Sequence, residues 1–201
     1  GLVLTAQEMR HALNQGIPTK LLKELANFEE FKKATCYSIP SKRQEDRDFT
    51  NRFVAFYLLG FNENYDGSLD EFLNIGMSKI YELSFSEIDK LKSDFKKSMK
   101  LSYEIFGDDA FRKRFKLSDN RKPISKAVYD TISVNFAWLK DSEKNILLSK
   151  KNIFSSKLID AFNNDDLFLR STSTATATKS NVKIRFEKIK TIIESTLKND
   201  K

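Results

Sequence analysis

Apolar residues recur at intervals of three and four along nearly the whole chain, which is the spacing of one face of an α-helix. The clearest case is residues 84–106, where Ser84 and Glu87 form a capping-box pattern and Gly107 follows the last apolar position. Only six Gly and three Pro occur in 201 residues, so few positions interrupt helices. We therefore expect an all-α fold, an irregular bundle of about eight to ten helices that forms one compact domain over residues 1–201.

Five long helices are expected to form the core, because each carries a continuous apolar face. Residues 46–59 are apolar on all sides in their second half, which is typical of a helix buried centrally. Residues 68–83 place Gly76 beside their apolar stripe, where a neighbouring helix can approach closely. The five expected ranges are 46–59, 68–83, 84–106, 125–140 and 182–197, and the seventeen Phe are the expected core material.

Shorter helices and loops are expected to connect these five. A helix over residues 6–15 would begin at Thr5, with Glu8 completing a capping box, and would end at Gly16. The Thr- and Ala-rich residues 170–178 could pass for a strand, but no second β-patterned segment is present to pair with them, so we expect a loop. The other short helices are expected at 19–26, 28–35, 108–113, 142–150 and 153–162, and the other loops at 37–45 and 117–124.

Positive charge is concentrated in the second part of the chain. Residues 1–111 contain 15 Lys and Arg against 18 Asp and Glu, whereas residues 112–201 contain 20 against 10, a net −3 against a net +10. A concentrated basic surface attracts polyanions, and nucleic acids are the commonest ones in cells. The alternative is that Lys-rich faces only keep a helical protein soluble. The candidate nucleic-acid contacts are Arg112, Lys113, Arg114, Lys116, Arg121, Lys122, Lys179, Lys183 and Arg185.

The residue inventory argues against several kinds of chemistry. The lone Cys36 cannot form an internal disulfide, and with the single His11 it provides no zinc ligand set, so we expect no metal, no cofactor and a reducing, cytoplasmic setting. The chain contains neither a phosphate-binding glycine loop nor a run of eighteen apolar residues, so a nucleotide hydrolase confined to this chain and a membrane span are not expected. Two acidic pairs occur at 108–109 and 165–166, and on a helix the two side chains of each pair would point about 100° apart. For the pair at 108–109 we favour helix capping over metal binding.

Gln7, Glu8 and Arg10 gather polar side chains on the first turns of the first expected helix. One interpretation is structural: Glu8 caps the helix and Arg10 pairs with a neighbouring acid. The other is that the three residues face a preceding domain and help to complete its site. A third possibility, an enzyme with its own site around Glu8, Arg10 and His11, also stays open.

Four segments resemble successive motifs of one family. They are residues 4–16 (LTAQEMRHALNQG), 47–56 (RDFTNRFVAF), 106–112 (FGDDAFR) and 173–186, which ends in VKIRF. In this order they are similar to the large bacterial and archaeal family that resembles the N-terminal part of GmrSD-type restriction endonucleases. The resemblance covers nearly the whole chain.

The resemblance implies a fragment. In the family these helices follow a ParB/sulfiredoxin-like domain that ends in an Asn-Thr-Gly-Gly turn, and Gly1 would be the last glycine of that turn. The nucleotide-hydrolysing Asp-Gly-Gln-Gln-Arg motif would lie in the absent first half, and the paired histidines of a downstream HNH nuclease do not occur here. The resemblance thus implies a non-catalytic helical domain of a DNA-defence protein, which packs on a ParB-like domain and contributes a basic surface to DNA binding. The alternative is a purely structural or protein-interaction module.

Overall fold

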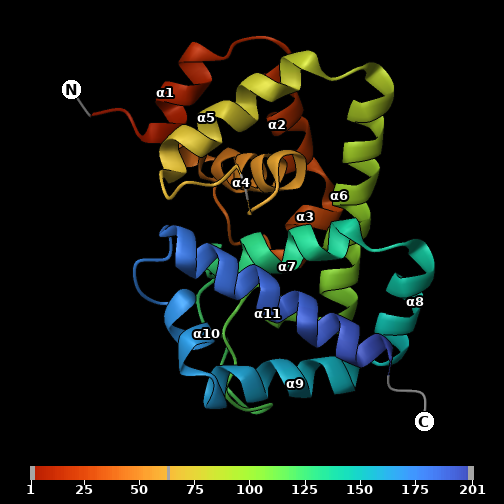
Figure 1. Ribbon diagram of the computed structural model, residues 1–201. Helices are drawn as coiled ribbons and strands as arrows, with labels where there is room; N and C mark the ends of the chain where they lie inside the picture. Colours follow the sequence, from red (N-terminus) through yellow and green to blue (C-terminus); the bar gives the residue numbers. More distant parts are fainter. Residues whose placement is uncertain (1–2, 63, 199–201) are drawn as a thin grey trace.

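The computed structural model describes residues 3–62 and 64–198, and these residues are mostly α-helical (Figure 1). Gly1 lies outside the described residues. The described residues form eleven α-helices: α1 (Ala6–Leu13), α2 (Ile17–Asn27), α3 (Glu29–Ala34), α4 (Glu45–Leu59), α5 (Leu69–Lys79), α6 (Phe85–Phe106), α7 (Lys126–Trp138), α8 (Asp141–Ser149), α9 (Lys151–Asn164), α10 (Asp166–Ser171) and α11 (Lys179–Leu197). Three short 3₁₀ helices join them: η1 (Lys42–Gln44), η2 (Ile80–Glu82) and η3 (Gly107–Asp109). The all-α prediction is confirmed.

Helix α7 runs through the middle of the molecule. It contacts α4, α6 and α11, and every residue from position 127 to position 137 is buried. Figure 1 shows α1, α2, α4 and α5 on one side of α7, with α9 and α10 on the other. A helix that is buried on all sides fits this central position, because the neighbouring helices cover each of its faces.

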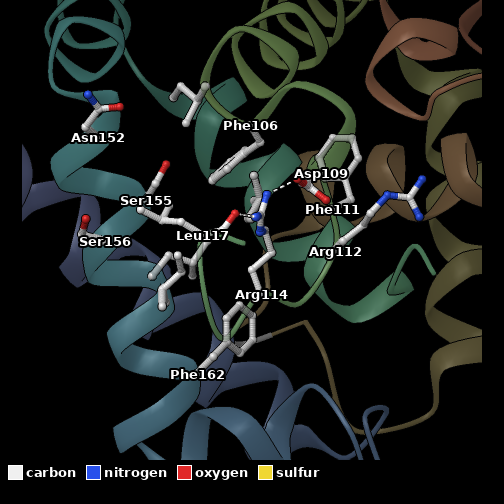
Figure 2. A pocket seen from close by; sticks show the side chains of 14 residues that line it. Phe106, Asp109, Phe111, Arg112, Arg114, Leu117, Asn152, Ser155, Ser156 and Phe162 are labelled. Atoms are coloured by element: carbon white, nitrogen blue, oxygen red, sulfur yellow. Dashed lines mark hydrogen bonds and ion pairs between the residues drawn. The ribbon is translucent and has the colours of Figure 1, made fainter. Parts of the chain in front are cut away.

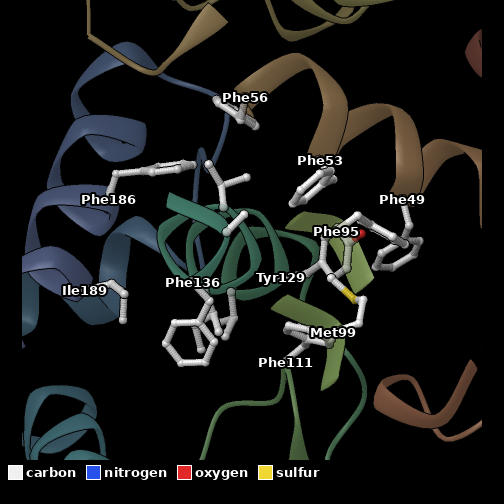
Figure 3. Close-up of a cluster of buried hydrophobic side chains, with 14 of the residues drawn as sticks. Phe49, Phe53, Phe56, Phe95, Met99, Phe111, Tyr129, Phe136, Phe186 and Ile189 are labelled. Carbon is white, nitrogen blue, oxygen red and sulfur yellow. The ribbon is translucent and has the colours of Figure 1, made fainter. Parts of the chain in front are cut away.

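Aromatic side chains fill the space between these helices, as Figure 3 shows for the centre of the core. Phe53 of α4 meets Phe95 of α6 edge to face with ring centroids 4.8 Å apart, and Phe56 lies 5.0 Å from Phe186 of α11. Such pairs add about 0.5–1.5 kcal/mol each beyond the area they bury. The expectation that Phe residues form the core is therefore confirmed.

The predicted close approach at Gly76 is also confirmed. A Cβ added to Gly76 would lie 2.5 Å from the Cβ of Ala55 and 2.8 Å from its Cα. Because the obstacle includes backbone, the two helices would have to move apart to accept any side chain at this position. The short residues Gly76 and Ala55 thus set the spacing between α5 and α4.

The predicted helix at 108–113 is wrong. After η3 the chain leaves the helical conformation at Ala110 (φ −53°, ψ 137°), and Phe111 adopts a positive φ of 63°. Arg112 then forms an isolated bridge with Ile124, while Ser125 donates its backbone N–H to the Phe111 carbonyl at 2.9 Å. The backbone groups of this segment are satisfied by residues just before α7, so an α-helix has no advantage here.

Other element boundaries differ at particular turns. Helix α5 ends at Lys79 and continues as η2, where a single helix to residue 83 was predicted. Helix α10 occupies the start of the predicted loop at 170–178, because Asp165 accepts a hydrogen bond from the Phe168 N–H at 2.9 Å and caps it. The remaining loop residues lead to α11, which Thr178 caps through the Asn181 N–H.

Candidate functional site

Glu8 caps the first helix. Thr5 accepts a hydrogen bond from the Glu8 N–H at 3.1 Å, and the Glu8 carboxylate accepts one from the Thr5 N–H at 2.7 Å. This second bond, followed by the hydrogen bond from Arg43, lowers the pKa of Glu8 below its ordinary value. The capping box predicted from the sequence is confirmed.

Arg10 is buried, with 4 % of its surface exposed, and is held by three side chains. Its Nε donates to Gln7 Oε1 at 3.0 Å, its Nη1 donates to Asp70 at 3.0 Å and its Nη2 donates to Asp48 at 3.2 Å. Gln7 is also buried and accepts a further bond from Asn51 at 3.3 Å. Glu8 as cap and Arg10 paired with acids match the structural interpretation, and the idea that these residues complete another domain's site stays a prediction.

A cavity of about 580 Å³ opens beside these residues, and we call it the N-terminal cavity. It lies between α1, the segment that contains η1, and the facing sides of α4 and α5. Its charged lining is mainly positive, with five cationic side chains against three acidic ones. These are Arg10, Lys42, Arg43, Arg52 and Lys126 against Glu45, Asp48 and Asp70.

Beneath the N-terminal cavity, two arginines share one aspartate. Arg52 donates from Nε and Nη2 to the Asp130 carboxylate at 2.8 and 2.5 Å, and Arg185 approaches the same carboxylate at 3.4 Å. Burial is the largest influence on both arginines and works to lower the pKa of each. For Arg52 the charge of Asp130, its hydrogen bonds and the charge of Asp48 together raise the pKa, whereas the pKa of Arg185 stays lowered. Two guanidinium groups on one carboxylate leave a buried excess of one positive charge.

Two donors in the lining of this cavity are unused. Gln7 Nε2 and Arg52 Nη1 have no hydrogen-bond partner among the described residues, although both side chains are less than a tenth exposed. An acceptor entering the cavity could therefore bond to donors that no other described residue uses. With the excess positive charge behind them, these donors suit an anion better than a neutral ligand.

The segment that closes one side of the N-terminal cavity is strained. Arg43 and Gln44 both adopt left-handed conformations (φ 55° and 59°), each at a cost of about 1–3 kcal/mol for a non-glycine residue. Gln44 Oε1 is buried and has no hydrogen-bond partner among the described residues. Strained backbone conformations of this kind are concentrated at ligand sites.

Two of the candidate nucleic-acid contacts are corrected by the structure. Arg185 is only 1 % exposed because its guanidinium faces Asp130 and the Thr176 carbonyl. Arg112 is buried because its guanidinium donates to the carbonyls of Asp108 and Lys122. Neither guanidinium is on the surface, so neither can meet a phosphate in this conformation.

The other candidate cations are divided between partly buried and exposed positions. Lys113 donates to Ser173 Oγ at 2.7 Å, and burial lowers the pKa of its ammonium group. Arg114 pairs with Asp109. The exposed candidates are Lys116, Arg121, Lys122, Lys179 and Lys183.

The two acidic pairs have different places in the structure. Asp108 and Asp109 lie in η3 and do not cap an α-helix, so that capping prediction is wrong because the helix it assumed is absent. Asp165 does cap α10. No group of three or more Asp, Glu, His or Cys among the described residues is placed to hold a metal ion. The Cys36 thiol has its pKa raised by burial and by its hydrogen bond to Asp108.

The sequence contained signals for the residues that were missed. Arg52 lies three positions after Phe49 and four before Phe56, and Arg185 lies three after Val182 and four before Ile189. Both arginines therefore share the buried face of their helices. Asp130 sits within an otherwise apolar helix, and a buried carboxylate needs a cationic partner. These three positions could have been predicted to meet inside the fold.

In comparisons with family models, curated proteins and solved structures, nothing matches this chain. None of the helices in the described part of the chain combines the length and apolarity needed to cross a bilayer. The fold and the N-terminal cavity are therefore the basis for the functional argument, and the resemblance to the GmrSD-type family stays a prediction.

Proposed function

We propose that this chain is a non-catalytic helical domain of a restriction-type DNA-defence protein. In this proposal the domain packs against a ParB-like domain through the surface around α1. It supplies the N-terminal cavity as part of a shared anion-binding site, and its exposed cations contribute to DNA binding.

The observation that carries the proposal is the buried excess of positive charge beneath the N-terminal cavity. An uncompensated buried charge is costly, and the cost falls when an anion binds next to it. Gln7 and Arg52 offer unused N–H groups to such an anion. A phosphate group carries negative charge and acceptor oxygens that could bond to these two donors.

The surface around α1 supports the packing part of the proposal. Leu13 is 80 % exposed, and Val3, Leu4 and Met9 are also exposed apolar residues. Large apolar side chains gathered at one end of a protein mark an interaction surface. A ParB-like domain seated there would cover these residues and enclose the mouth of the N-terminal cavity.

Pyrophosphate binding by Gln7 variants tests the shared-site claim. Gln7→Glu keeps an acceptor for Arg10 and Asn51 but replaces the free amide with a negatively charged oxygen. We expect inorganic pyrophosphate, titrated by calorimetry at low salt, to bind at least about tenfold more weakly to this variant, because one bond to a charged group contributes about 1.5–3 kcal/mol.

Gln15→Glu is the matched control, because it adds the same charge at an exposed position near the end of α1. Its affinity for pyrophosphate should stay within about twofold of the original chain, since it lies outside the cavity lining. Equal weakening in both variants, or no saturable binding to the original chain, would contradict the proposal.

One observation favours the alternative of a purely structural module. Several exposed lysines pair within their own helix, such as Lys183 with Glu187 at 3.8 Å and Lys190 with Glu194 at 4.0 Å. Pairs of this kind support a solvated helix without needing a partner. The salt dependence of DNA binding separates the two functions.

A further inference from the structure

A second cavity, of about 210 Å³, lies on the opposite side of the molecule from α1 (Figure 2). It is enclosed by the end of α6, the irregular segment after η3, and one face of α9. We call it the α9 cavity. The segment in which a helix was expected at 108–113 is thus one wall of a small cavity.

The floor and walls of the α9 cavity are apolar and partly aromatic. Phe106, Phe111 and Phe162 line it, together with Ile105, Ile132, Leu158 and Ile159. At its rim Leu117 is 74 % exposed, although it is a large apolar residue. A ligand seated in the cavity would cover Leu117 and remove its apolar surface from water, which is favourable.

The polar groups of the α9 cavity are few and incompletely bonded. Arg114 pairs with Asp109 and donates to the Leu117 carbonyl, but its Nε is buried and has no partner among the described residues. Figure 2 shows the Arg114 guanidinium between Asp109 and Leu117, near the middle of the lining residues. Across the cavity, Asn152 and Ser155 of α9 make no side-chain hydrogen bond to any other described residue.

One wall of this cavity is also held in a strained conformation. Phe111 has a φ of 63°, a genuine outlier for a bulky aromatic residue. Its cost, about 1–3 kcal/mol, is offset by the contact of its ring with Tyr129, at 4.9 Å between centroids, and by the bond from the Ser125 N–H. This backbone conformation places the Phe111 ring at the cavity wall and directs the following residues across the mouth of the cavity.

We propose that the α9 cavity binds a small aromatic carboxylate. An apolar cavity of about 150 Å³ holds benzene, so 210 Å³ accommodates one ring with a short substituent. Arg114 brings a guanidinium with an unused, buried Nε–H to this cavity, and such a donor favours an anionic head over a cationic one. This inference is independent of the proposed function, since it involves neither α1 nor the N-terminal cavity.

In the bound state the ring lies between the phenylalanines of the floor, and the carboxylate lies at the rim beside Arg114. The Arg114 side chain is about one-fifth exposed, so it can shift until Nε–H meets a carboxylate oxygen. Asn152 and Ser155 donate to the second oxygen from the α9 side. The buried Nε–H of Arg114 then has a partner.

Benzoate titration followed by NMR tests the proposal, with toluene as the uncharged comparison. Benzoate should cause saturable shifts at residues that line the α9 cavity, and toluene should bind at least about tenfold more weakly. Arg114→Lys keeps the charge but loses the planar N–H groups, so benzoate affinity should fall about tenfold or more. Arg121→Lys, at an exposed position outside the lining, should leave the affinity within about twofold.

A cavity-filling variant keeps the test decisive if Arg114→Lys disturbs the fold. Ile159→Trp should abolish benzoate binding by occupying the space for the ring. Ile153→Trp adds the same ring at an exposed position on the same helix and should bind benzoate normally. Benzoate binding that persists in Ile159→Trp, toluene binding as tightly as benzoate, or no saturable binding of benzoate would each overturn the proposal.

Discussion

The buried cations at the centre of this molecule and the exposed cations on its outer surface, which we call the rim, differ in what holds them. At the centre, Arg52 and Arg185 are buried against Asp130, and each is fixed by bonds inside the fold. On the rim, Lys116, Arg121 and Lys122 are exposed. Counting charges along the sequence gives both groups the same weight. Burial separates them, because only cations on the outer surface can contact the phosphates of a DNA duplex.

The same comparison explains the role of each group. A buried guanidinium contributes to the fold through its carboxylate, and its removal leaves a charge without a partner. An exposed lysine contributes little to stability, since water and salt screen it. Substitutions of the buried cations at the centre should therefore lower the free energy of unfolding. Substitutions of the exposed cations on the rim should instead weaken binding to DNA.

Asp130→Asn should have the largest effect on stability. It removes the only carboxylate that pairs with Arg52 and Arg185 in the described residues, leaving two buried cations to face each other. We expect a loss of about 3–5 kcal/mol in the free energy of unfolding, measured with urea. Asp141→Asn removes an exposed carboxylate that pairs with Lys97 and, at 3.5 Å, with Lys144, and it should cost no more than about 1 kcal/mol. Equal losses would remove the distinction between centre and rim.

Gly76→Ala tests whether the apolar packing at the centre is as sensitive to substitution as its charges are. The added methyl group would overlap Ala55, on the same helix as Arg52, so α4 and α5 must separate. We expect a loss of about 1–3 kcal/mol in urea unfolding, and Ala55→Gly in the same chain should restore part of it. Ser78→Ala, at an exposed position of α5, should change stability by no more than about 0.5 kcal/mol. If Gly76→Ala leaves the free energy of unfolding unchanged, the spacing between α4 and α5 is not tight.

The sequence predicted the long helices because their apolar faces repeat over many turns, as in α6, and because local signals such as Thr5 with Glu8 set their ends. It did not predict the segment around Phe111, whose conformation depends on bonds to residues more than ten positions away. Nor did it place the N-terminal cavity, which is assembled from four separate segments. Arg10 could be predicted to pair with an acid, but not with Asp48 and Asp70 in particular, since their proximity comes from the packing of α1 on α4 and α5.

The rim should show the smallest effect on stability and the largest effect on binding. The triple reversal Lys116→Glu, Arg121→Glu and Lys122→Glu should change the free energy of unfolding by no more than about 0.5 kcal/mol per position. The matched control reverses three exposed lysines of α2 and α3, namely Lys20, Lys23 and Lys33. Both variants change the net charge equally, so any difference between them comes from where the charge lies.

The affinity of these chains for duplex DNA, measured by fluorescence anisotropy over a range of salt, tests the central claim most directly. With five exposed candidate cations, the original chain should show a log–log salt slope of about −4 to −5. The rim reversal should reduce that slope by about three, and the control should leave it nearly unchanged. A slope near zero for the original chain, or equal weakening by both reversals, would contradict the account and favour a purely structural module.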